Sequence, residues 1–232
     1  MKTRHLLPRL LLLSGLCIWG LSTASYANET LEAEWKLIKD KDSVQVYTKT
    51  IDGYDLKAFK GVTTVDASLE NLYHLFLDVD NMTNWMHTVT ETRPLEKVSN
   101  TEFILYTTYN APWPATDRDS VVKTAWVQDP NSLELTNNIH ALPGYMEKAS
   151  NFVRMPYVKA YFTFAPISAT QTTVIYEAHA DPGGALPAWI VNMVALDTPL
   201  YTLINLKKVL KKERKEGDFP FANYPALVAA DF

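Results

Sequence analysis

Residues His179 to Lys212 carry the clearest structural signal in the chain: HADPGGALPAWIVNMVALDTPLYTLINLKKVLKK. Asp181-Pro182-Gly183-Gly184 interrupts the regular pattern, because proline and glycine break strands and helices. From Pro187 to Lys212, apolar residues recur every three or four positions. That period predicts one long amphipathic helix that buries one face against the rest of the protein.

Upstream of this helix the residues alternate between apolar and polar, which is typical of β-strands. Two shorter helices are also predicted, over Leu31–Lys39 and behind Asp66, which would cap the second. The order of helices and strands predicts an α+β fold, in which a curved antiparallel sheet wraps around the last helix. The predicted strands are Val44–Tyr47, Leu56–Val65, Phe103–Asn110, Ser120–Gln128, Leu133–His140, Phe152–Phe164 and Thr172–Ala180.

The N-terminus has the pattern of a secretory signal peptide. Lys2, Arg4 and Arg9 supply positive charge, Leu10–Leu21 is apolar, and Ser25-Tyr26-Ala27 offers small residues for cleavage after position 27. The sequence therefore predicts an exported protein that is periplasmic or secreted. The remaining residues, 28–232, contain no repeat or linker and are predicted to form one domain.

Composition excludes several classes of function for residues 28–232. Cleavage would leave 19 basic and 26 acidic residues, a net charge of −7, which argues against nucleic-acid binding. Cys17 is the one cysteine of the chain and leaves with the leader, so neither a disulfide nor a thiol nucleophile is expected. The sequence contains no cofactor or metal motif. A monomer is expected, because no coiled-coil heptads are present.

Three motifs resemble the START (StAR-related lipid transfer) domains, over about Glu34 to Arg214. Trp85 resembles the tryptophan at the end of the family's first long helix, and 112–119 resembles its loop that ends in Arg-Asp before a strand. His179–Trp189 resembles the D-x-x-G-x-[LI]-P-x-W signature that opens the last helix. The resemblance implies a helix-grip fold with an internal cavity for one lipid, and a lid formed by the last helix and the loop near Trp113. It also implies transient membrane contact and no catalytic activity.

One departure from the family pattern concerns the buried charge pair of sterol-binding members. The resemblance places Thr107 and Thr124 where those members often carry an acidic residue and an arginine. It therefore gives no support for a sterol and leaves the head group open.

The predicted ligand-binding residues are bulky side chains on the strands, the lid segments and the last helix, with one arginine. They are Trp85, Tyr106, Trp113, Arg118, Tyr145, Tyr161, Tyr176, Trp189, Met193, Leu196 and Leu200. Tyr106, Tyr161 and Tyr176 are favoured as lining residues, because a buried hydroxyl needs a partner. Since strand side chains alternate, half of the strand candidates must face away from the cavity. A solid core, with no cavity, is the alternative.

Charged side chains also have two interpretations. Arg118 either reaches a ligand carboxylate or phosphate or fastens its loop to the sheet, and the second role is favoured. Arg154 and Lys159 are expected to be solvated edge residues. The lysines of 207–215 either contact an anionic membrane or form a solvated helix end.

An enzyme that acts on an apolar substrate in the same cavity is the alternative function. It would place an acid–base pair inside the cavity. The candidate residues are His140, His179, Asp181 and Glu177. A domain whose own side chains fill the cavity, and which binds no lipid, is the third hypothesis.

Overall fold

The computed structural model of the protein describes residues 34–54, 56–212 and 215–225. The predicted signal peptide lies outside these residues. The described strands and helices are β1 (Lys36–Lys41), β2 (Val44–Lys49), β3 (Ala58–Val65), α1 (Leu69–Leu77), η1 (Val79–Asn84), β4 (Val89–Lys97), β5 (Glu102–Tyr109), β6 (Arg118–Gln128), β7 (Leu135–Ala141), β8 (Val153–Arg154), β9 (Tyr157–Ser168), β10 (Gln171–Asp181) and α2 (Ala188–Lys212).

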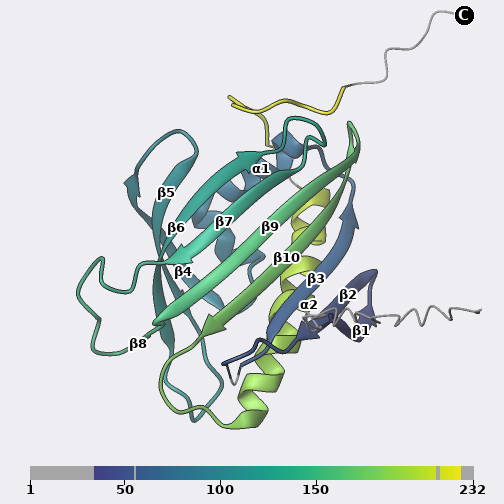
Figure 1. Cartoon of the computed structure of the whole chain (residues 1–232). Coiled ribbons are helices and arrows are strands. Elements are labelled where there is room, and N and C mark those ends of the chain that lie inside the picture. The colour runs from purple at the N-terminus through teal and green to yellow at the C-terminus, as the bar shows by residue number, and fades with distance from the viewer. Residues whose placement is uncertain (1–33, 55, 213–214, 226–232) are drawn as a thin grey trace, which may run out of the picture. The chain divides into compact units, whose positions relative to one another are not determined.

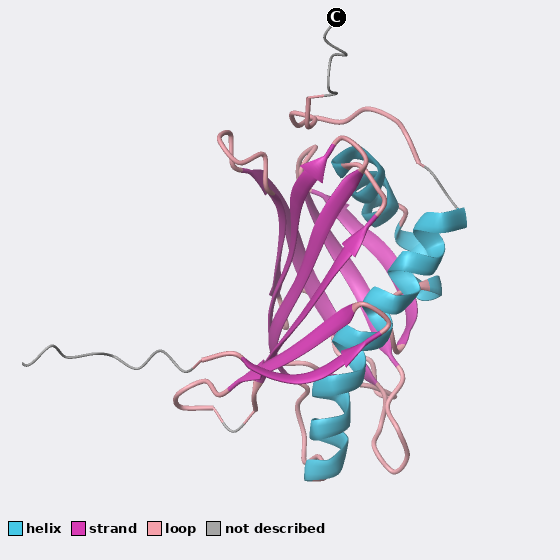
Figure 2. Cartoon of the chain, turned by 90° about the vertical axis from the view of Figure 1, so that its right-hand side faces the viewer, coloured by secondary structure: helices cyan, strands magenta, loops and turns pink. Residues whose placement is uncertain are grey.

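The described residues form one curved sheet with the order β1-β2-β3-β10-β9-β7-β6-β5-β4. All of these neighbours are antiparallel, and the short β8 pairs in parallel with β6. The long helix α2 runs along one face of the sheet beside β3, and α1 lies at the end of the sheet opposite the start of α2 (Figures 1 and 2). The predicted α+β, helix-grip fold is confirmed. Within the described residues, no helix combines the length and apolar character needed to cross a membrane.

Alternation along each strand decides which side chains enter the interior. On β9, Ala160, Phe162 and Phe164 are buried on the inner face, while the intervening residues are only partly buried. From the other side, leucines 200, 203, 206 and 210 of α2 are buried against the sheet, at the three- and four-residue spacing of one helix face. The core therefore lies between the inner face of the sheet and the helices.

Gly61 allows α2 to lie close to β3. A Cβ atom at this position would lie 2.8 Å from Leu203 Cδ1 and 3.0 Å from Pro199 Cβ. Both distances are shorter than a favourable contact between carbon atoms. A side chain at position 61 must therefore push the helix or its leucine away from the sheet.

Replacing Gly61 with alanine is expected to lower the free energy of unfolding by about 1–2 kcal/mol, because overpacking strains a filled core. Chemical denaturation measures the change. Gly144→Ala is the control, since nothing lies within 4 Å of a Cβ built at Gly144. Equal losses in the two variants would contradict this close packing.

The structure corrects several sequence-based expectations. Residues 36–39 of the segment predicted as the first helix belong to strand β1, and β4 was not predicted at all. The cap of α1 is Ser68, whose side chain accepts a hydrogen bond from the Asn71 amide, and not Asp66. The segment predicted as one strand over Phe152–Phe164 is divided into β8 and β9, with Pro156 between them.

A buried ion pair on the outer face of the sheet overturns the expectation that Arg154 is solvated. Its Nε and Nη2 atoms donate to the two carboxylate oxygens of Asp119 at 2.9 and 2.8 Å, and both side chains are 1% exposed. The same guanidinium donates to the carbonyl oxygens of Pro143, Met146 and Glu147. Arg154 therefore fastens the connection between β7 and β8 across the back of β6.

Candidate functional site

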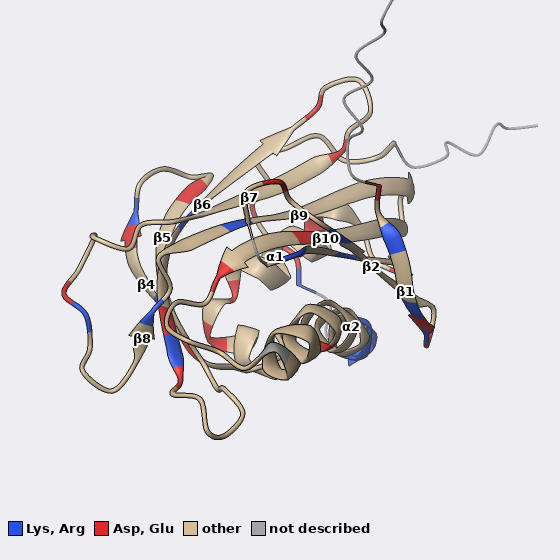
Figure 3. Cartoon of the chain, turned by 60° about the horizontal axis from the view of Figure 1, so that its bottom comes forward, with Lys and Arg blue, Asp and Glu red and all other residues tan. Residues whose placement is uncertain are grey.

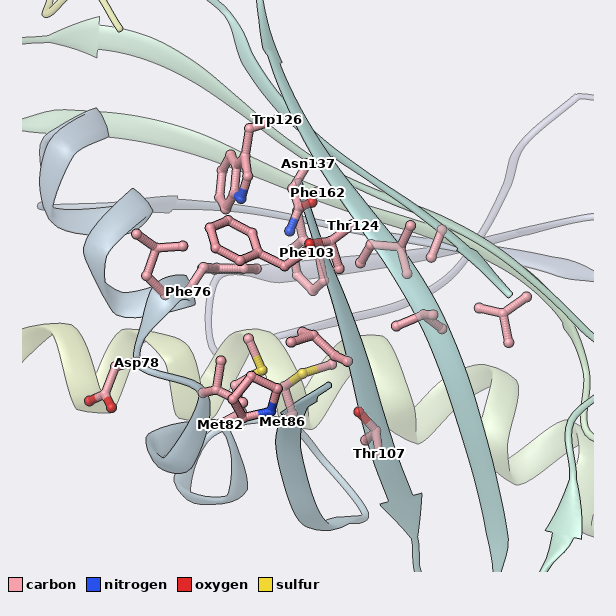
Figure 4. Close-up of a pocket in the computed structure, with 18 of the residues that line it drawn as sticks. Phe76, Asp78, Met82, Met86, Phe103, Thr107, Thr124, Trp126, Asn137 and Phe162 are labelled. Carbon is pink, nitrogen blue, oxygen red and sulfur yellow. The ribbon is translucent and has the colours of Figure 1, made fainter. Parts of the chain in front are cut away.

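A cavity of about 480 Å³, the main chamber, lies between the inner face of the sheet and the α1–η1 segment (Figure 4). Its wall is mostly apolar. The apolar and aromatic lining residues are Phe76, Leu77, Val79, Met82, Met86, Pro94, Phe103, Leu105, Tyr109, Val122, Trp126, Ile139, Val158, Ala160, Phe162 and Tyr176.

A second chamber, of about 180 Å³, lies between the sheet, the loop that contains Pro112 and the first half of α2. Its helical wall includes Ile190, Met193 and Val194. Five residues line both chambers, so the two spaces adjoin. These shared residues are Met86, Tyr109, Val158, Ala160 and Tyr176.

The polar groups of the main chamber's inner wall are neutral. Thr107, Thr124 and Asn137 are buried and line it, together with the hydroxyl-bearing Tyr109 and Tyr176. Burial raises the pKa of Tyr109 and of Tyr176 above the ordinary value of a phenol, so both hydroxyls stay uncharged at neutral pH. The interior therefore favours an uncharged ligand.

The charged residues of the main chamber lie at its rim. Asp80, Glu96 and Lys97 are exposed, and the half-buried Asp78 forms an ion pair with Lys215. Exposed charges pay little desolvation cost, unlike charges inside the chamber. The chamber thus changes from apolar inside to charged where it meets solvent.

Arg118 fastens the start of α2 to the sheet. Its guanidinium donates to the carbonyl oxygens of Thr116, Pro182 and Gly183. Burial lowers the pKa of Arg118, and the nearby Asp117 opposes that shift. Arg118 also lines the second chamber, so it lies at the site while making the structural contacts favoured from the sequence.

Of five other predicted ligand-binding residues, two line a chamber and three belong to the core or pack against it without lining either chamber. Tyr176 lines both chambers and Met193 lines the second. Leu200 is buried in the core, and Leu196 packs against that core. Trp85 is fully buried, with its ring 4.7 Å from that of Phe76, which lines the main chamber.

Three of the predicted tyrosines are not wall residues. Tyr106 points to the outer face of the sheet, where it packs with Ile104 and Val121. Tyr161 alternates with the inward-facing Ala160 and Phe162, and its ring lies beside His140 on the outer face. Tyr145 is exposed, and its hydroxyl donates to Glu96.

The two predicted lid tryptophans are exposed. Trp113 is 88% and Trp189 is 53% exposed. They belong to the loop and the helix that border the second chamber, but neither lines it.

Sequence reasoning missed much of the main chamber. Trp126 and Asn137 occupy opposed positions on β6 and β7, and Asn137 in turn opposes Phe162 of β9. The α1–η1 segment adds Phe76 and Met82. The resemblance assigned Thr107 and Thr124 to the charge-pair positions, and both residues line the chamber. Because strand side chains alternate, these two residues make the inward faces of β5 and β6 predictable.

The residues proposed for the enzyme alternative line neither chamber. The ring of His179 packs against the rings of Tyr54 and Tyr157. Oε1 of Glu177 lies 4.0 Å from Nζ of Lys60. His140 and Asp181 do not line either cavity. In the part of the chain that the structure describes, no group of three or more His, Cys, Asp or Glu side chains is placed to hold a metal ion.

Comparison with known proteins gives consistent results. The START domain model matches residues 24–214. An uncharacterized protein of Pseudomonas aeruginosa is 30% identical over 186 residues, which cover 80% of this chain and 91% of that protein. The structure of a STAR-related lipid transfer protein fragment from Xanthomonas axonopodis, also 30% identical, has a TM-score of 0.70 and covers 76% of this chain and 98% of that one. The phosphatidylcholine transfer protein of Bos taurus is 23% identical over 172 residues, covering 70% and 78% of the two chains. The chain therefore belongs to the START domain family, as its three motifs predicted.

Proposed function

We propose that the protein binds one lipid, or a similar apolar ligand, in the two adjoining chambers and carries it between membranes. The observation that carries this proposal is the apolar space of about 480 and 180 Å³ beneath the sheet. Ligand pockets typically measure ~300–1,000 Å³ and combine apolar walls with a few polar groups. The relatives named for lipid transfer support the same function.

Moving an apolar lipid chain from water into such a space is favourable and needs no catalytic group. Burial of a methylene contributes ~0.8 kcal/mol, so a sixteen-carbon chain gains roughly 13 kcal/mol before ordering costs of several kcal/mol. From Arg118 beside the second chamber to Trp126 in the main chamber, β6 advances eight residues, or roughly 26 Å. The chambers thus offer an extended ligand a long apolar path.

We propose that the membrane contact involves the end of the domain where α2 begins. Trp113, Trp189 and Val194 are exposed there, and tryptophan side chains favour the interface between water and lipid. The first half of α2 has no Lys or Arg, whereas basic residues gather at its far end (Figure 3). We further propose that the protein acts after export, in the periplasm or outside the cell, because its N-terminus has the pattern of a signal peptide.

A vesicle assay tests the function. Donor vesicles that contain a self-quenched fluorescent phospholipid are mixed with unlabelled acceptor vesicles, and dequenching reports transfer. The protein is expected to accelerate transfer in proportion to its concentration. A rate equal to that of spontaneous exchange, for phospholipid and for neutral lipid probes alike, would contradict the carrier function.

Replacing Trp113 with alanine is expected to slow transfer several-fold, because one exposed aromatic contact with the membrane is lost. The affinity for a lipid delivered from cyclodextrin should stay unchanged, since Trp113 does not line a chamber. Ile167→Ala, at an exposed position on the β9–β10 hairpin, is the control and should retain the wild-type rate. Unchanged transfer by the Trp113 variant would remove this loop from the proposed membrane contact.

A further inference from the structure

The main chamber contains one buried polar group that the protein leaves unsatisfied. Asn137 of β7 is 4% exposed and lines the chamber, and its Oδ1 atom has no hydrogen-bond partner among the described residues. Figure 4 shows its amide at the chamber wall, close to Thr124 and Phe162. Buried polar atoms without a partner are rare and unfavourable. A group on the ligand is therefore the natural partner for this amide.

The surroundings of Asn137 restrict the chemistry of that group. On the neighbouring strands, Trp126 and Phe162 occupy the positions opposite Asn137, so two aromatic rings flank the amide. Thr107 and Thr124 add neutral hydroxyls to the same chamber, and the charged lining residues lie at the rim. A charged group beside Asn137 would lose its hydration without meeting an opposite charge. The partner of Asn137 must therefore be neutral.

We infer that the ligand carries a neutral hydroxyl group and that this hydroxyl bonds to the Asn137 amide inside the main chamber. This inference rests on the proposed function. A hydroxyl both donates and accepts, so it satisfies the amide whichever way the oxygen and nitrogen face. Phosphate, carboxylate and quaternary ammonium groups do not meet this requirement. The ligand class is thus a long apolar molecule with an alcohol at its buried end.

Paired probes of nearly equal size test the inference. 1-Hexadecanol and 1-fluorohexadecane differ at the terminal group, and only the alcohol donates a hydrogen bond. Both are delivered from cyclodextrin to the full-length mature protein, and their affinities are measured by displacement of a fluorescent fatty probe. The wild type should bind the alcohol roughly tenfold or more tightly, because a site that bonds a hydroxyl rejects an analogue without one.

Asn137→Leu should abolish this preference, leaving affinities for the two probes within about twofold of each other. The lipid-free variant should melt at the same temperature as the wild type or higher, because an unsatisfied buried amide has been removed. A purely structural Asn137 would instead give a lower melting temperature and an unchanged preference. Asn138→Leu is the matched control, since Asn138 donates to the Ala125 carbonyl oxygen and does not line the chamber. It should keep the wild-type preference.

The outcomes separate this inference from the function on which it rests. Equal affinity of the wild type for the two probes, or an unchanged preference in Asn137→Leu, overturns the hydroxyl assignment and leaves lipid binding standing. Failure of the wild type to take up either probe overturns both.

Discussion

Replacing Ala160 with phenylalanine is expected to reduce lipid binding by at least about a hundredfold while the protein stays folded. Ala160 lies on the inner face of β9 and lines both chambers, so a ring at this position occupies the space where they adjoin. The ring fills existing space rather than displacing core residues, so the stability of the lipid-free protein should change by less than ~1 kcal/mol. Titration with a fluorescent lipid and thermal melting measure the two effects.

Ala165→Phe is the matched control for this prediction. It makes the same substitution on the same strand. Residue 165, however, follows the inward-facing Phe164 and therefore lies on the outer face of the sheet. This variant should bind lipid like the wild type. Full binding by Ala160→Phe, with its fold intact, would contradict a ligand that occupies the adjoining chambers.

Replacing Asp119 with alanine is expected to lower the free energy of unfolding by about 3–5 kcal/mol, because the Arg154 guanidinium would stay buried without its countercharge. The double variant Asp119→Leu, Arg154→Met should recover much of this loss, since it removes both charges. Urea denaturation of the single and double variants measures the coupling.

The exposed ion pair between Lys123 and Glu102, at 3.1 Å, supplies the comparison for this prediction. Lys123→Ala should cost no more than about 1 kcal/mol, because solvent screens surface ion pairs. A loss of that small size for Asp119→Ala would show that the Asp119–Arg154 pair is not what holds the β7–β8 connection to the sheet.

The elements with a buried face were predictable from the sequence, and the edge strands were not. The helix α2 repeats apolar residues over seven turns and follows a clear break at Asp181–Gly184. The two edge strands lack that signal, since β1 is exposed throughout and β4 carries Pro94 and mostly exposed residues. Edge strands of this kind are specified by pairing with their neighbours and not by burial.

The cavity wall was predictable only where the inward face of a strand was known. Thr107 on the inner face fixes the inward set of β5, which includes Tyr109 and excludes Tyr106. No local pattern reveals that Asn137 meets Trp126 and Phe162, because that contact depends on the register of three strands. Arg154 was misjudged for the same reason, since its partner Asp119 lies 35 residues away.

Native mass spectrometry of the mature protein, purified from the organism that makes it, tests the bound ligand most directly. We expect a major species with one apolar molecule per chain, which organic extraction removes and identifies. The Ala160→Phe variant, prepared in the same way, should appear at the mass of the chain alone. A wild-type protein that carries no extractable molecule, and gains none from a total lipid extract of that organism, would contradict the account.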